Sequence, residues 1–199
     1  WDHIQGIPFF VPIYRSDFTI HIYSGHQADV SLEGVLRGQM QEPNFPVSLG
    51  GLPAKFSFNE VVRGTSFDVP GATIRTIRLT HPNEATGLRF EAECKTFVHL
   101  TDHEHSEKEH ERIVEFCRGA DVLSMDTMFT KEEYATHRGW GHSHWEHAIE
   151  IAKDAGVGRL VMFHHDPDRS DDSLDKMGAE ARKLFPATVV AHEGLILEI

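Results

Sequence analysis

The chain has 199 residues, of which 40 % are hydrophobic and 25 % are charged, as in an ordinary globular protein. It contains no apolar run of about 18 residues, so we expect neither a membrane-spanning helix nor a membrane partner. The 19 basic and 31 acidic residues give a net charge of −12, which argues against an extended nucleic-acid surface. Cys94 and Cys117 have neither C-x-x-C spacing nor the pattern of a disulfide framework. We therefore expect a cytoplasmic protein with one domain over residues 1–199.

The first half of the chain is predicted to be mostly β-structure. Apolar side chains such as Phe9, Phe10 and Tyr14 are expected in the core. Alternation over residues 18–23 predicts a strand, and residues 29–41 are predicted to be helical. Prolines and glycines predict a loop over residues 42–55. Further strands are predicted at residues 56–62, 73–80, 88–92 and 96–101.

The second half alternates between predicted helices and short apolar strands. Helices are predicted at residues 106–117, 143–155 and 171–185, the last with Ser170 as its N-cap. Strands are predicted at residues 120–124, 159–163, 188–191 and 195–199. Strands and helices mixed in this way predict a layered α/β sandwich.

Fifteen histidines are an unusually high number, and histidine is the commonest metal ligand among side chains. Histidine and aspartate gather in four segments at the ends of predicted strands, where a rigid backbone can hold ligands at fixed distances. Imidazole together with carboxylate suits zinc, manganese or iron. The four segments are residues 2–3, 80–83, 101–105 and 163–167.

The order of these segments carries a resemblance. Residues 1–6, Trp-Asp-His-Ile-Gln-Gly, resemble the second half of the H-x-H-x-D-H motif of the metallo-β-lactamase superfamily. The superfamily order continues with His81 before a Gly-Leu-Arg-Phe strand, then Asp102, then His164, each near a strand end. Gly141-His142-Ser143 is similar to the Gly-His-Ser-Thr helix of the ribonuclease Z and phosphodiesterase branch. Residues 125–129, with Asp126, are similar to that branch's His-Glu-Ala-Thr-Phe segment.

The resemblance implies an αββα sandwich and a site for two divalent metal ions, Zn²⁺ first, with Mn²⁺ or Fe as alternatives. Asp2, His3, Asp102 and His164 would hold one ion, while His81 and the bridging Asp102 would belong to the other. The two histidines of H-x-H would precede Trp1. We therefore expect a chain truncated at its N-terminus that lacks the first strands of the fold.

The resemblance also implies a mechanism. Two cations roughly 3.5–4 Å apart would hold a bridging hydroxide as the nucleophile and clamp the phosphoryl oxygens. His142 would stabilise charge or donate a proton to the leaving group, and Asp126 would orient His142. Asp2 would handle a proton while it ligates.

This pattern favours a hydrolase acting on a cyclic nucleotide or another small phosphodiester. A tRNA 3′-processing endonuclease is the alternative, weakened by the short acidic stretch between Asp126 and His142, which has no long basic arm. Lactam or thioester hydrolysis fits the neighbourhood of His142 less well. A non-catalytic metal-binding module is a further alternative, because the first metal site is incomplete. A homodimer is also compatible with the sequence.

Several neighbouring residues have simpler interpretations. Ser143 could be a helix N-cap, and His144 and His147 are expected on the solvated side of that helix. His103 and His105 are expected to be loop residues beside Asp102, with metal chelation as the alternative. His165 is expected to make a hydrogen bond at the rim of the sheet, and Trp145 is expected to pack in the core. Trp140 could form the wall of a pocket for a base or another planar group. His164-His165-Asp166 also resembles the all-helical histidine–aspartate phosphohydrolases, against which the predicted strands argue.

Overall fold

A computed structural model of the chain describes residues 3–25 and 30–199. The chain forms two compact units, Trp1–Arg63 and Gly64–Ile199, and each is described by itself below. The prediction of a single domain over the whole chain stays a prediction. Among the described residues, none of the helices is both long enough and apolar enough to cross a membrane.

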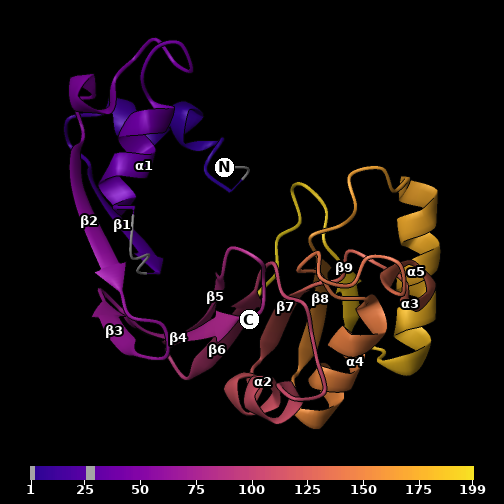
Figure 1. Cartoon of the computed structure of the whole chain (residues 1–199). Helices are drawn as coiled ribbons and strands as arrows, with labels where there is room; N and C mark the ends of the chain where they lie inside the picture. The colour runs from indigo at the N-terminus through magenta and orange to yellow at the C-terminus, as the bar shows by residue number, and fades with distance from the viewer. Residues whose placement is uncertain (1–2, 26–29) are drawn as a thin grey trace. The chain divides into compact units, whose positions relative to one another are not determined.

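The first unit is a two-stranded parallel sheet with short helices. Strand β1 (Thr19–Gly25) pairs with β2 (Lys55–Val61), and helix α1 (Leu32–Gln39) lies between them in sequence (Figure 1). Ser31 begins α1, because its side chain accepts a hydrogen bond from the Gly34 amide. The core of the unit comprises the buried side chains of Ile13, Leu36, Met40, Leu49 and Leu52.

The segment before β1 differs from our expectation. It forms two turns of 3₁₀ helix, η1 (Ile7–Phe9) and η2 (Val11–Tyr14), and a further turn η3 (Leu49–Gly51) precedes β2. The prediction that Phe9, Phe10 and Tyr14 belong to the core is wrong, since all three are exposed and Phe9 is 76 % exposed. A 3₁₀ helix repeats every three residues, so a turn this short buries only one side of the chain, here Pro8 in η1 and Ile13 in η2.

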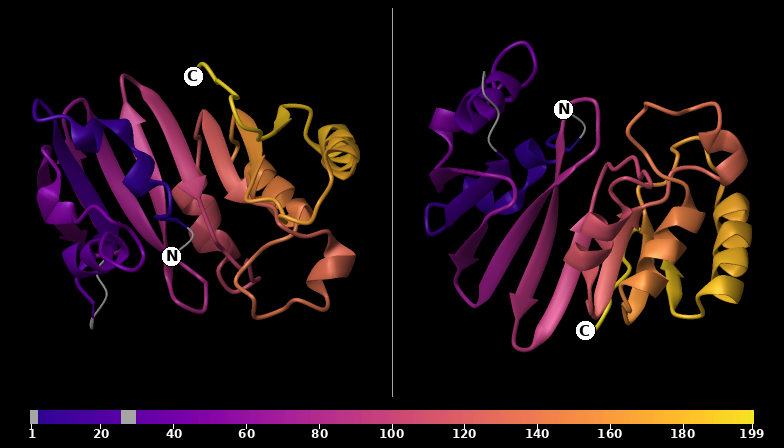
Figure 2. Two further views of the ribbon diagram at one scale, coloured as in Figure 1. Left: turned by 90° about the horizontal axis from the view of Figure 1, so that it is seen from above. Right: turned by 60° about the horizontal axis from the view of Figure 1, so that its bottom comes forward.

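The second unit contains a seven-stranded sheet whose spatial order follows the chain order (Figure 2). The first four strands are antiparallel and the last four parallel, with β6 common to both halves. Every residue of β7 is buried, as expected for a central parallel strand covered on both faces. The strands are β3 (Ser66–Val69), β4 (Ala72–Leu79), β5 (Ala85–Ala92), β6 (Lys95–Leu100), β7 (Val122–Asp126), β8 (Arg159–Phe163) and β9 (Thr188–Val190).

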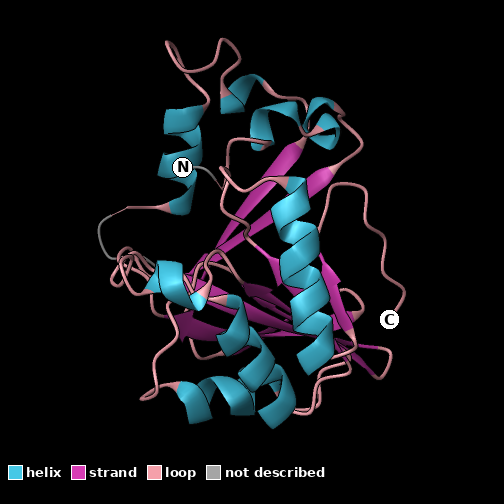
Figure 3. Ribbon diagram, turned by 90° about the vertical axis from the view of Figure 1, so that its right-hand side faces the viewer, coloured by secondary structure: helices cyan, strands magenta, loops and turns pink. Residues whose placement is uncertain are grey.

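Helices pack against the parallel half of this sheet (Figures 1 and 3). Helix α4 (Trp145–Asp154) contacts β7 and β8, and it is flanked by α2 (His110–Cys117) and α5 (Asp171–Leu184). The predicted apolar stripe of α4 is confirmed, because Ala148, Ile149 and Ala152 are buried in the core of the unit. Ser170 caps α5 as predicted, accepting a hydrogen bond from the Ser173 amide.

Three local predictions differ from the structure. Residues 195–199 are not a strand: Gly194 has a φ of +83° in a turn, and Ile196 is 87 % exposed. Strand β3 and helix α3 (Lys131–Tyr134) were not predicted, because each has only four residues and shows little periodicity. Helix α3 is instead specified by a capping box in which Thr130 and Glu133 exchange hydrogen bonds.

Strand direction decides where the candidate site lies. Strands β4, β6, β7 and β8 run in the same direction, because β5 is antiparallel to both β4 and β6. Their carboxyl ends therefore share one edge of the sheet. His81, Asp102, Asp126 and His164 lie at or just after these four ends.

Candidate metal centre

The structure brings together five predicted site residues of the second unit. The ligand atoms of His81, Asp102 and His142 all lie within 4.8 Å of one another. The same holds for Asp126, His142 and His164. His142 belongs to both groups, and its ring stacks on that of His164 with centroids 4.9 Å apart. The five side chains therefore form one cluster at the sheet edge.

Asp102 lies between two of the imidazoles. Its Oδ2 is 3.7 Å from His81 Nε2, and its Oδ1 is 3.5 Å from His164 Nδ1. The carboxylate is buried, and its Oδ1 also accepts a hydrogen bond from Thr101 Oγ1 at 3.0 Å. His164 has a left-handed backbone with a φ of 56°, an unusual conformation for a residue other than glycine, and such conformations concentrate at functional sites.

Asp126 lies behind His142 with none of its surface exposed. His142 Nδ1–H donates to Asp126 Oδ2 at 2.8 Å, and the amides of His103 and Met128 donate to the same carboxyl group at 3.2 and 3.0 Å. Burial raises the pKa of Asp126, against the effect of these donors. Burial also acts to lower the pKa of His142, but the hydrogen bond and the charge of Asp126 outweigh it and raise that pKa.

A glycine lets the loop before His142 approach His81. Gly141 has a φ of +94°, and a Cβ there would overlap the His81 ring and lie 2.7 Å from Pro82 Cδ. Only glycine satisfies both the backbone conformation and the close approach. The loop is thereby held against the strand end that carries His81.

Glu104 anchors the same loop, and sequence reasoning did not identify it. Its carboxylate accepts the Gly139 amide at 2.8 and 2.9 Å, the Gly141 amide at 2.9 Å and the Tyr134 hydroxyl at 3.0 Å. In the sequence, only two features could have indicated this role: Glu104 follows Asp102 by two residues, and two glycines precede His142. Glu104 thus connects the loop after β6 to the loop that carries His142.

A second group of histidines is buried beside the cluster. His103 and His105 lie in the loop beside Asp102, as predicted, but they are buried there, and His144 is only 4 % exposed. The prediction that His144 and His147 lie on the solvated side of α4 is therefore wrong: their rings stack with centroids 3.6 Å apart, and His147 also contacts His105. Burial lowers the pKa of His105 to about 4 and that of His147 to about 3, so both are neutral at pH 7.

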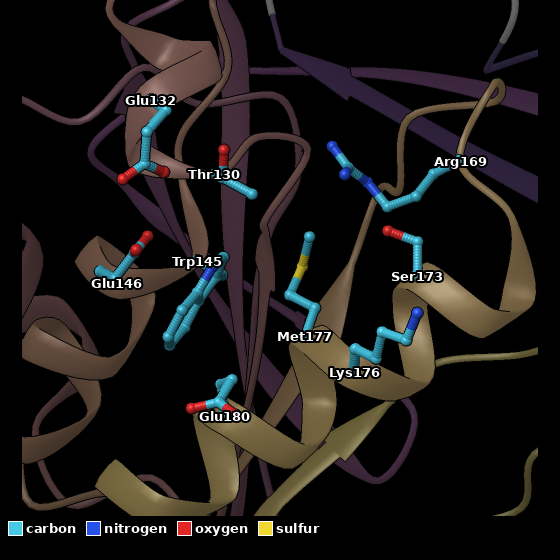
Figure 4. A pocket seen from close by; sticks show the side chains of 9 residues that line it. All are labelled: Thr130, Glu132, Trp145, Glu146, Arg169, Ser173, Lys176, Met177 and Glu180. Atoms are coloured by element: carbon cyan, nitrogen blue, oxygen red, sulfur yellow. The ribbon is translucent and has the colours of Figure 1, made fainter.

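Other neighbours of the cluster have structural contacts. Ser143 is not an N-cap: α4 begins at Trp145, and Ser143 Oγ accepts the His105 amide at 3.0 Å. His165 Nε2–H donates to the Ala191 carbonyl at 3.1 Å, the kind of hydrogen bond that we expected. Trp145 packs against the core of the second unit. Its indole also faces a pocket between α3, α4 and α5, where Met177 lies beside it (Figure 4).

Two further metal ligands were predicted near the start of the chain. Asp2 lies outside the described residues, and His3 belongs to the first unit. Ligation by Asp2 and His3, and the proton-handling role of Asp2, stay predictions.

Comparison with known domain families and proteins agrees with this geometry. The family described as the beta-lactamase superfamily domain matches residues 1–165. This chain belongs to the metallo-β-lactamase superfamily. Ribonuclease Z of Parabacteroides distasonis is 30 % identical over 141 residues, which are 70 % of this chain and 42 % of that protein. Ribonuclease Z of Gemmatimonas aurantiaca is 41 % identical over 83 residues, 42 % of this chain and 26 % of that protein.

Solved structures confirm the predicted metallo-β-lactamase type of α/β fold. The metallo-β-lactamase fold protein YhfI of Bacillus subtilis superposes with a TM-score of 0.71 at 24 % identity, covering 98 % of this chain and 71 % of that protein. The short form of human tRNase Z gives a TM-score of 0.67 at 18 % identity, covering 91 % and 68 %. The curated relatives place the chain in the ribonuclease Z-like branch of the superfamily. The chain spans less than half the length of these curated relatives.

Proposed function

We propose that this chain provides the catalytic centre of a metal-dependent hydrolase that cleaves small phosphodiesters, a cyclic nucleotide among them. The observation that carries the proposal is the convergence of His81, Asp102, His142 and His164, with the buried Asp126 behind His142. Membership of the superfamily and the ribonuclease Z relatives support the same class of reaction.

The donor set fits divalent metal ions such as Zn²⁺. Imidazole nitrogens and carboxylate oxygens are ligands that zinc accepts at about 2.0–2.2 Å, so two of them on one tetrahedral ion lie roughly 3.3 Å apart. The distances of 3.7 and 3.5 Å from Asp102 to His81 and His164 are close to that value. We assign His81 and Asp102 to one ion and Asp102 and His164 to the other, with Asp2 and His3 as further ligands of the second. Such ions supply Lewis acidity for the phosphoryl oxygens and lower the pKa of water.

His142 and Asp126 are suited to move a proton during the reaction. Asp126 fixes the His142 ring through Nδ1–H, which leaves Nε2 to face the substrate. A histidine whose pKa is raised by a buried carboxylate is protonated in a larger fraction of molecules near neutral pH. We infer that His142 Nε2–H donates its proton to the departing oxygen as the bond from phosphorus to that oxygen breaks.

The size of the substrate distinguishes two candidate functions. The net charge of −12 disfavours a long polyanion and is compatible with one phosphodiester held at a local cationic centre. Processing of tRNA 3′ ends is the second candidate, since the curated relatives are named ribonuclease Z. Two assays on the same protein distinguish these functions: steady-state hydrolysis of cyclic nucleotides, and cleavage of a precursor tRNA that carries a 3′ trailer.

Metal removal and restoration tests the proposal directly. We expect hydrolysis of bis-p-nitrophenyl phosphate to disappear after chelation and to return with Zn²⁺ or Mn²⁺. Asp102→Ala should lower metal affinity and turnover by on the order of a hundredfold, since loss of a group that only supports a metal ligand already costs about 10–100-fold. His192→Ala is the matched control, because this histidine is exposed and its Nδ1 hydrogen-bonds to the carbonyl of the adjacent Glu193. Metal-loaded protein without diesterase activity would overturn the proposal.

A further inference from the structure

An exposed aromatic side chain lies in the loop that leads to His142 of the candidate metal centre and has no part in the fold's core. Trp140 is 59 % exposed, and it lies two residues before His142. An indole carries a large apolar surface, so a tryptophan left in water is a common sign of a contact surface. The question is what the indole would contact.

The backbone around Trp140 is held in place on both sides. Glu104 accepts the amides of Gly139 and Gly141, the residues that flank Trp140. Both glycines have positive φ, 86° and 94°, so the loop follows a path that few other residues could adopt. The indole is thus presented from a fixed loop, which reduces the conformational entropy lost when a ligand binds.

A row of rings joins Trp140 to the metal centre. The rings of His142 and Phe129 are 6.2 Å apart, those of Phe129 and His137 4.8 Å, and those of His137 and Trp140 4.6 Å. Phe129 is buried, whereas Trp140 at the far end is exposed. The row therefore begins at the residue that would donate a proton to the leaving group and ends at a surface open to a ligand.

We propose that Trp140 is a specificity-determining residue that stacks on the planar base of a nucleotide phosphodiester substrate. This inference rests on the proposed function, and it narrows the substrate class from any small diester to one that carries a nucleobase. Stacking suits a chain of net charge −12 because an indole attracts a base without further cationic side chains. It also tolerates different bases, since each has a π-face.

A pair of substrates with the same leaving group tests the proposal. Thymidine 5′-(p-nitrophenyl phosphate) carries a base, and ethyl p-nitrophenyl phosphate does not. With Zn²⁺-loaded protein, Trp140→Ala should lower kcat/KM for the thymidine ester about tenfold, mainly through KM, as loss of one base–aromatic stack does. The same variant should leave kcat/KM for the ethyl ester unchanged. Trp140→Phe should retain most of the preference, and equal melting temperatures verify that the variants are folded.

A binding measurement keeps this inference separate from the proposed function. Equilibrium dialysis with adenosine monophosphate and ribose 5-phosphate measures the contribution of the base without turnover. We expect wild-type protein to bind adenosine monophosphate more tightly, and Trp140→Ala to abolish that difference. If neither ester is hydrolysed, only the proposed function is overturned. Equal binding of the two phosphates, or equal effects of Trp140→Ala on both, overturns the role of Trp140 even if both esters are cleaved.

Discussion

At the scale of single residues, the Asp126–His142 pair makes the sharpest prediction about chemistry. Asp126→Asn removes the charge that raises the pKa of His142, so fewer molecules carry the protonated imidazole at neutral pH. We expect kcat to fall on the order of 10²-fold for a methyl ester, whose poor leaving group needs the proton, and much less for a p-nitrophenyl ester. The basic limb of the pH–rate profile should move to lower pH.

The control for this pair is Asp17→Asn, which removes an exposed carboxylate that bonds to Arg15 in the first unit. It should change neither the rate nor the pH profile. A loss in Asp126→Asn that is equal for the two leaving groups would exclude a proton-donor role for His142 and would leave Asp126 with a structural role only.

Gly141 makes a prediction about space at the same scale. Gly141→Ala adds a Cβ that overlaps the His81 ring, in addition to the strain of a positive φ. We expect a loss of about 1–3 kcal/mol in the free energy of unfolding and a weaker affinity for Zn²⁺, measured by urea unfolding and by competition with a chelator. Gly139→Ala is the matched control: its φ is +86°, yet nothing lies within 4 Å of the added Cβ. If both variants lose the same zinc affinity, contact with His81 is not the cause.

At the scale of elements, Glu104 joins two loops that are distant in sequence. Glu104→Gln keeps the size of the side chain but removes the negative charge to which two backbone amides and one hydroxyl donate hydrogen bonds. Hydrogen bonds to charged groups contribute about 1.5–3 kcal/mol each, so exchange of the Gly139 and Gly141 amides with deuterium should accelerate roughly tenfold or more. Exchange in β7 should not change. Unchanged protection at both glycines would show that the loop holds its conformation without Glu104.

Local patterns explain why most elements could be predicted and some could not. Strand β8 and helix α5 have strong apolar periodicity or a clear cap, and their predicted bounds match within a residue. Helix α3 depends on a four-residue capping box. The buried position of His144 and the half-buried position of His147 depend on packing against Tyr134 and His105. Packing between distant segments is not encoded in a local pattern, so polar residues were assigned to solvent.

The candidate site was predictable to the extent that it depends on strand ends. His81, Asp102 and His164 follow apolar strands, and parallel direction brings such ends to one edge. Glu104 was missed because its role depends on the φ angles of Gly139 and Gly141, which have no signature beyond the glycines themselves. Residue types at strand ends therefore predicted the metal-binding chemistry. The residues that hold the site in place, such as Glu104, could be identified only from the three-dimensional structure.

At the scale of the whole molecule, the buried histidines predict how stability depends on pH. Burial depresses the pKa of His105 to about 4 and that of His147 to about 3, whereas in the unfolded chain both take up protons near pH 6.5. Between those values the unfolded state binds more protons than the folded state. The free energy of unfolding should therefore fall as the pH is lowered from about 7 to about 4, by at most ~1.4 kcal/mol per pH unit for each histidine.

The variant His147→Gln isolates one of these contributions. It removes a group that the unfolded chain protonates first, so its stability should fall less steeply with acid than that of the wild type. Urea titration at several pH values should show that, from pH 7 toward pH 4.5, the free energy of unfolding falls more for the wild type than for the variant. His192→Gln, in which an exposed histidine is replaced, should follow the wild-type curve. Parallel curves for His147→Gln and wild type would mean that His147 is protonated equally in the folded and unfolded states, and that its packing against His105 does not hold it neutral.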